Sequence, residues 1–171
     1  MAEAADVTIR RATAADLPAV VAMVRVMSGM HVAWDAARWV PPVDIAAEYG
    51  AWLERSLAGD GLMMAVAERG GAVVGYVVAE EGEARPVVWS GRHVYVNDLY
   101  VAEGVRRSGA GAALLAAARA WAAERGTQLR ALCSGANGAA QAWFTRHGFR
   151  PAAVEMVLDT PAADAPAPAP R

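Results

Sequence analysis

Two arginines and two glycines lie close together in VRRSGAG, residues 105–111, and could bind an anion. Glycine allows the backbone to approach a ligand closely, and the first N–H groups of a following helix have no intrahelical partner. Those N–H groups and the positive end of the helix dipole suit a diphosphate. Arg106 and Arg107 can add charge-assisted hydrogen bonds. The alternative is a tight turn between a strand and a helix that binds nothing.

Two common phosphate-binding motifs do not fit these residues. A P-loop requires Lys and then Ser or Thr after the glycine-rich turn, but Gly111 is followed by Ala112-Ala113. A dinucleotide-binding turn requires a third glycine, where this chain has Leu114. It also requires an acidic residue on the next strand, and residues 127–134 contain none. The pattern that remains is R-x-x-G-x-G, from Arg106 to Gly111.

The elements that must position this motif can be read from the pattern of apolar residues and turn residues. Ser28-Gly29 should end the first helix, and Gly70-Gly71 should form a hairpin turn. The order of elements predicts an α/β (α+β) fold, a mixed, mostly antiparallel sheet flanked by about four helices. Strands are expected at residues 7–11, 62–69, 72–81, 86–101, 127–134 and 149–158, and helices at residues 14–27, 43–57, 109–124 and 136–147.

Composition narrows the class of protein. The 171 residues suit one domain, expected over residues 1–159, followed by a disordered Pro/Ala-rich tail over residues 160–171. A net charge of -2 with scattered arginines does not suggest a nucleic-acid partner. The single cysteine excludes an internal disulfide, and we expect neither a signal sequence nor a membrane span. These features favour a cytoplasmic protein, and the abundance of Ala, Arg and Gly suggests a bacterial one.

Three segments together resemble the GNAT superfamily of acetyl-CoA-dependent N-acyltransferases. They are NDLYV at residues 97–101, the VRRSGAG turn, and NGAAQAWFTRHGF at residues 137–149. In that family the first is strand four, the second is the pyrophosphate turn, and the third begins a helix that borders the coenzyme. The element order predicted above matches the family fold, and members are often homodimers, so a homodimer is a further expectation.

The resemblance implies that acetyl-CoA binds between the fourth and fifth strands. The pantetheine arm would pair with the backbone there, and a strand-four N–H near Tyr100 or Val101 would polarise the thioester carbonyl. Backbone N–H groups of the turn would hold the diphosphate. The coenzyme-binding residues implied are Leu99, Tyr100, Val101, Arg106, Arg107, Ser108, Gly109, Ala110, Gly111, Ala112, Asn137, Ala140 and Phe144.

An acetyl acceptor needs a base, because a primary amine with a pKa near 10 is mostly protonated at pH 7. Family members often carry an acidic residue on strand four, at a position that aligns with Asn97. Asn97 cannot act as a base, so its neighbour Asp98 is the proposed base, with Glu48 and His31 as alternatives. A structural or acceptor-binding role for Asp98 stays open.

The family tyrosine that protonates the leaving thiolate is replaced by Phe144. Tyr100 or Tyr95 could substitute, or the thiolate could leave unaided, because a thiol pKa near 8.5 makes it a fair leaving group. Phe144 could still pack against the pantetheine arm. Cys133 fits either a small buried side chain or a residue at the acceptor site.

The acceptor site is expected around MHVAWDAARWVPP, residues 30–42, where His31, Trp34 and Trp39 could receive a cation or a ring. Asn97 is assigned to it as well. Packing of these aromatic residues on the sheet is the alternative. No metal is expected, because the three histidines, His31, His93 and His147, are dispersed along the chain.

The predicted function is direct transfer of an acetyl group from acetyl-CoA to a primary amine of a small molecule, within a ternary complex. A non-catalytic acyl-CoA-binding or sensing module is an alternative, because Asn97 and Phe144 alter both usual catalytic positions. Acetylation of a protein N-terminus is a third hypothesis.

Overall fold

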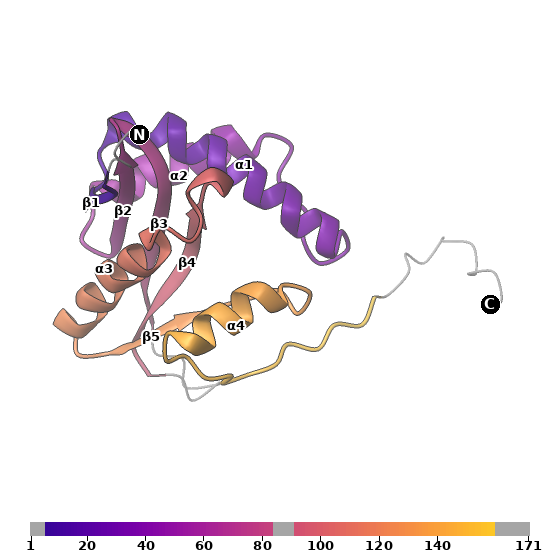
Figure 1. The fold of residues 1–171 in the computed structure, drawn as a ribbon. Helices are drawn as coiled ribbons and strands as arrows, with labels where there is room; N and C mark the ends of the chain where they lie inside the picture. Colours follow the sequence, from indigo (N-terminus) through magenta and orange to yellow (C-terminus); the bar gives the residue numbers. More distant parts are fainter. Residues whose placement is uncertain (1–5, 84–90, 160–171) are drawn as a thin grey trace.

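A single five-stranded sheet forms the centre of the protein, and the computed structural model describes residues 6–83 and 91–159. The strands lie in chain order across the sheet (Figure 1). The first four pair antiparallel and the last pair, β4 and β5, is parallel. The prediction of a mixed, mostly antiparallel sheet is therefore confirmed. The strands are β1 (Thr8–Arg11), β2 (Leu62–Arg69), β3 (Ala72–Gly82), β4 (His93–Val101) and β5 (Gln128–Ala131).

Helices cover both faces of the sheet and divide the core into two clusters (Figure 1). Helix α3 (Ala110–Glu124) packs Leu114 and Trp121 against one face. Helices α1 (Leu17–Trp34) and α2 (Ile45–Leu57) pack Val20, Val24 and Leu53 against the other. Helix α4 (Gly138–Arg146) lies beside β5 and has no buried residue.

The glycine hairpin and a β-bulge set the register of the central strands. Gly70 and Gly71 have φ of 58° and 79°, which a two-residue type I′ turn requires, so the predicted hairpin is confirmed. Further along, Val78 pairs with Asp98 but Ala79 pairs with Val96. The residue between them on β4 is an extra, bulged one, and a bulge reverses which face the following side chains occupy.

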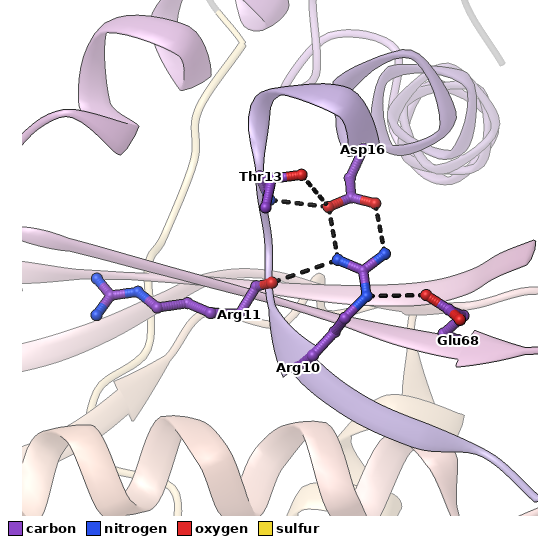
Figure 2. A network of polar contacts seen from close by, with 5 residues as sticks. All are labelled: Arg10, Arg11, Thr13, Asp16 and Glu68. Atoms are coloured by element: carbon purple, nitrogen blue, oxygen red, sulfur yellow. Dashed lines mark hydrogen bonds and ion pairs between the residues drawn. The ribbon is translucent and has the colours of Figure 1, made fainter. Parts of the chain in front are cut away.

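An ionic network fixes the start of the first helix to the sheet (Figure 2). The Arg10 guanidinium on β1 makes two 2.8 Å contacts with the Asp16 carboxylate and a third of 2.8 Å with Glu68 on β2. The Thr13 N–H and hydroxyl also donate to Asp16, at 2.8 and 3.0 Å. This is the capping box that begins the 3-10 turn η1 (Ala14–Asp16). These hydrogen bonds hold the pKa of the buried Asp16 carboxyl well below its usual range.

Two predicted element boundaries are wrong. Helix α1 continues through Ser28-Gly29 to Trp34, because Gly29 is exposed in open space and one glycine costs a helix only about 1 kcal/mol. Residues 149–158 do not form a strand, because residues 151–159 are exposed and pair with no strand in the described part of the chain. The predicted tail, residues 160–171, and the start of the predicted strand at residues 86–90 lie outside the described residues.

By length and composition alone, residues 14–34 could also cross a membrane, contrary to the expectation from sequence. This is weak evidence, because a core helix meets the same criterion. Val20 and Val24 of this helix are buried against Leu53 and Tyr76. In this structure the segment therefore serves as a helix of the domain core.

Candidate active site

Strands β4 and β5 separate partway along their length. Their pairing ends at Val96 and Ala131, although β4 continues to Val101. The N–H of Ala102 donates to the Val74 carbonyl on β3, at 2.8 Å. Because alternate residues of a strand direct their backbone groups to opposite sides, the groups of Leu99 and Val101 face the open side, where β5 has diverged.

The glycine-rich turn lies directly beyond the end of β4. Arg107 has φ of 69° and Gly109 has φ of 90°, so the backbone turns sharply before α3. Within the described residues, the N–H groups of Arg107, Gly109, Gly111 and Ala112 have no hydrogen-bond partner. Residues 106–109 are exposed. Exposed, unpartnered N–H groups at a helix N-terminus form an anion site, so this turn fits a diphosphate.

The Arg106 side chain has a hydrogen-bond partner, and in this it differs from the Arg107 side chain. Its Nε donates to the Val101 carbonyl at 3.2 Å, and its guanidinium carbon lies 5.9 Å from the centre of the Tyr100 ring. The side chain therefore crosses the end of β4. Arg107, by contrast, makes no side-chain hydrogen bond or ion pair within the described residues and extends from the exposed turn. Of the two guanidinium groups, that of Arg107 is therefore the more available to bind an anion.

Helix α4 begins at an Asn137 cap, and its Trp143 side chain reaches the start of α3. The Asn137 side chain accepts a hydrogen bond from the Ala140 N–H at 3.1 Å, which is the geometry of an N-cap. A Cβ added at Gly111 would lie 3.5 Å from the Trp143 ring. Helix α4 and the start of α3 are thus neighbours on the same side of the separated strands.

The bulge at Asn97 places Asp98 on the face covered by α1 and α2. There the Asp98 carboxylate accepts a short hydrogen bond from the Tyr49 hydroxyl on α2 and one of 3.3 Å from the Tyr76 hydroxyl on β3. Burial raises the pKa of Asp98, while both phenols and the nearby His31 oppose that rise. A carboxylate with a raised pKa is suited to accept a proton near neutral pH.

Sequence reasoning missed the two tyrosines. The pKa values of Tyr49 and Tyr76 are both raised, chiefly by burial and then by the Asp98 charge, so both phenols stay protonated as donors. Tyr49 was visible only as one apolar-face residue of a helix, and Tyr76 only as one residue of a strand. No spacing in the sequence connects positions 49, 76 and 98.

Aromatic residues of the expected acceptor segment gather around His31. The His31 ring contacts Trp34 and Trp39, with centroids 5.1 and 4.6 Å apart. The Nδ1 atom lies 2.9 Å from the Met27 carbonyl, which can only accept, so Nδ1 is the donor of this hydrogen bond. His31 and Trp34 lie on the last turns of α1, and only Trp39 lies on the loop. The other proposed base, Glu48, lies in the first turn of α2.

The remaining predicted residues lie elsewhere in the fold. Tyr100 packs in the cluster under α1 and α2, with its ring 6.4 Å from that of Tyr76. Phe144 stacks edge-on against Phe149 at 5.0 Å and has no proton to donate. Burial raises the pKa of the half-buried Cys133 thiol, so this group is not an activated nucleophile. Tyr95 is half-buried, and burial raises its pKa as well. Over residues 6–83 and 91–159, no cluster of three or more His, Cys, Asp or Glu could hold a metal ion.

Comparison with known proteins shows the family and the fold of the chain. The family model of the acetyltransferase (GNAT) family matches residues 30–149. A comparison with curated protein sequences found no match. Among solved structures, the chain is similar to an aminoglycoside 6'-N-acetyltransferase from Acinetobacter haemolyticus, with 16% identity, a TM-score of 0.70, and 91% of this chain and 99% of that chain covered.

Two further structures share the fold and carry coenzyme-derived ligands. One is a predicted acetyltransferase from Clostridium acetobutylicum with acetyl-CoA, with 18% identity, a TM-score of 0.69, and 90% of this chain and 96% of that chain covered. The other is AAC(6')-Iy in complex with a bisubstrate analogue built on CoA and acetylneamine, with 19% identity, a TM-score of 0.68, and 91% and 99% covered.

Proposed function

The chain belongs to the acetyltransferase (GNAT) family, and from this premise we propose that it moves an acetyl group from acetyl-CoA to a primary amine of a small molecule. The observation that supports this most strongly is one short stretch of β4. Between Asp98 and the anion-binding turn that begins at Val105, it presents the Asp98 carboxylate and, on the side where β5 has diverged, the backbone of Leu99 and the N–H of Val101. A thioester, an amine and a diphosphate could therefore all bind along this part of the chain.

The residues proposed to hold acetyl-CoA lie along the open side of β4 and the turn after it. The N–H groups of Arg107, Gly109, Gly111 and Ala112 would receive the diphosphate, with the Arg107 side chain beside them. The backbone of Leu99 and Val101 would pair with the pantetheine amides. Acetyl-CoA supplies an activated acetyl group. Since Tyr100 directs its N–H toward β3, the Leu99 or Val101 N–H is the donor available to the thioester carbonyl.

Proton transfer is assigned to Asp98. The acceptor amine arrives as an ammonium, and the Asp98 carboxylate takes its proton so that the nitrogen lone pair can attack the acetyl carbon. The carbon–sulfur bond then breaks, the acetylated nitrogen loses its second proton to solvent, and the thiolate takes a proton from solvent, because Phe144 has no proton to donate. Tyr49 and Tyr76 orient the carboxylate throughout.

The acceptor is proposed to bind between Asp98 and the aromatic group of His31, Trp34 and Trp39. His31 lies near enough to Asp98 to affect its pKa, and the indole rings flank His31. An ammonium beside a carboxylate and aromatic faces is favoured by charge and by cation–π attraction. Some structural neighbours are aminoglycoside acetyltransferases, and aminoglycosides are therefore one class of amine to test.

The experiment is a thiol-release assay with acetyl-CoA and a panel of aminoglycosides, polyamines, aralkylamines and peptide N-termini. Turnover with at least one small amine, and initial-velocity lines that intersect when both substrates are varied, would support direct transfer in a ternary complex. Parallel lines would indicate an acyl-enzyme instead. Tight binding of acetyl-CoA without turnover on the whole panel would contradict the proposed function and favour a sensing role.

A further inference from the structure

Glu80 on β3 is a carboxylate that the proposed mechanism does not use. Tyr76 and Val78 of the same strand pack in the cluster under α1 and α2, and Glu80, two residues beyond Val78, lies on the same face. Leu62, directly opposite Glu80 on β2, belongs to that cluster as well. Glu80 therefore lies on the face of the sheet that carries Asp98.

The Glu80 carboxylate has no partner within the described part of the chain. It is half-buried, and its side chain makes no hydrogen bond or ion pair with the described residues. Its neighbour Glu81 points to the opposite face and pairs with Arg125 at 2.5 Å. Glu68 of β2 pairs with Arg10 at 2.8 Å. A half-buried carboxylate without a partner has lost hydration and gained no counter-ion, so Glu80 is suited to receive a cation from outside the chain.

Glu80 and Asp98 are close enough to bind one molecule together. Asp98 is directly opposite Val78, and Glu80 lies two residues along β3 from that pair. Strand geometry then gives about 8 Å between the Cα atoms of the two acidic residues. The charges of both carboxylates reach the Tyr49 phenol, because burial raises its pKa most, the Asp98 charge next and the Glu80 charge least.

We propose that Glu80 binds a second ammonium group of the acceptor, so that the enzyme prefers amines with two positive charges. This inference rests on the proposed function, because the first ammonium is the one that gives its proton to Asp98. With about 8 Å between the two Cα atoms, the matching separation of the nitrogens is roughly 6–9 Å, that of linear diamines with about four to six methylenes. Glu80 contacts the end of the acceptor that does not react, so it determines specificity and takes no part in the chemistry.

The first test compares each linear diamine, from ethylenediamine to octamethylenediamine, with the n-alkylamine of the same chain length in the thiol-release assay. At the best length, kcat/KM for the diamine should exceed that for the monoamine by about tenfold. Glu80→Gln should remove most of this preference through a higher KM with kcat little changed, because the lost contact is the same in the ground state and the transition state. Glu54→Gln, the same change at an exposed glutamate of α2, should keep the preference.

Glu80→Asp tests the geometry. It shortens the carboxylate arm by one methylene, so the best diamine should become longer by about one methylene. Equal kcat/KM for diamines and matched monoamines with the wild type would overturn the role of Glu80, and so would a preference that survives Glu80→Gln. Both outcomes would leave acetylation of amines standing.

Calorimetry separates this inference from the proposed function. Absence of turnover with every amine would contradict the proposed function, and binding of the best-matching diamine to the CoA-loaded protein would still test Glu80. The diamine should bind about tenfold more tightly to the wild type than to Glu80→Gln, while the n-alkylamine should bind both equally. Equal affinities of the diamine for the two proteins would contradict the inference.

Discussion

Removal of the Tyr49 hydroxyl should move the pH dependence of the reaction in a direction that the structure fixes. Activity should fall on the acidic side as Asp98 becomes protonated, because the base must be a carboxylate. Tyr49 donates to that carboxylate and so lowers its pKa, against the larger effect of burial, which raises it. In Tyr49→Phe the pKa of Asp98 should therefore rise further, and the acidic limb should move to higher pH.

The size of the shift follows from the hydrogen bond that is lost. A hydrogen bond to a charged group contributes about 1.5–3 kcal/mol, and about 1.4 kcal/mol corresponds to one pKa unit. Tyr76 still donates to Asp98 at 3.3 Å in the variant. We expect the acidic limb to move by roughly one to two pH units. Asp98→Asn should instead remove that limb and lower kcat/KM by about 10²–10⁴-fold.

The assay is thiol release from acetyl-CoA across pH 5–10 at low concentration of the acceptor, so that kcat/KM reports the free enzyme. Tyr95→Phe is the matched control, because Tyr95 is also a half-buried tyrosine of this region but its hydroxyl is not bonded to Asp98. A Tyr49→Phe profile whose acidic limb coincides with that of wild type, or moves to lower pH, would refute the assignment of Asp98 as base. An Asp98→Asn profile that keeps the limb would refute it too.

Three further substitutions test the fold and the turn. Asp16→Ala removes the acceptor of four hydrogen bonds and should lower the free energy of unfolding in urea at pH 7 by about 2–3 kcal/mol. Because the pKa of Asp16 is depressed in the folded state, the difference between variant and wild type should persist above pH 4. It should shrink as the pH falls below about 4 toward the folded pKa. Gly75→Ala would put a Cβ 2.8 Å from a backbone oxygen of β4 and should lower Tm by about 4 °C, whereas Gly61→Ala, in open space, should change Tm by less than about 1 °C. Gly109→Ala must hold an alanine at φ of 90° and should weaken acetyl-CoA binding in calorimetry roughly tenfold. The control Gly104→Ala, nearby at an ordinary φ, should bind acetyl-CoA as wild type does. Equal affinities for the two variants would show that the left-handed turn does not matter for binding.

Most of the strands and helices and the glycine-rich turn could be predicted from the sequence, because the signals for them involve only neighbouring residues. Alternating apolar residues and Gly70-Gly71 predict the β2–β3 hairpin, and the helical spacing from residue 109 to 124 predicts α3. The R-x-x-G-x-G turn depends on the φ preference of glycine and on the free N–H groups at the start of a helix. Both are properties of a few neighbouring residues.

The incorrect predictions arose where tertiary packing or strand pairing outweighed a local sequence signal. Ser28-Gly29 resembles a helix stop, but the following turns of α1 carry His31 and Trp34 into the aromatic group, and that packing offsets the cost of one glycine. Residues 149–158 have the composition of a strand, but a strand exists only where a neighbouring strand accepts its hydrogen bonds. In the described part of the structure, residues 149–158 pair with no strand.

The sequence by itself determined the order of elements, the anion-binding turn and the presence of a carboxylate at position 98. Only the tertiary structure decided what surrounds that carboxylate. The bulge at Asn97 turns Asp98 to the α1–α2 face, and Tyr49 and Tyr76 reach it from a helix and a neighbouring strand. A pKa depends on burial and on contacts between residues far apart in the chain, and these are fixed only when the sheet and its helices pack together.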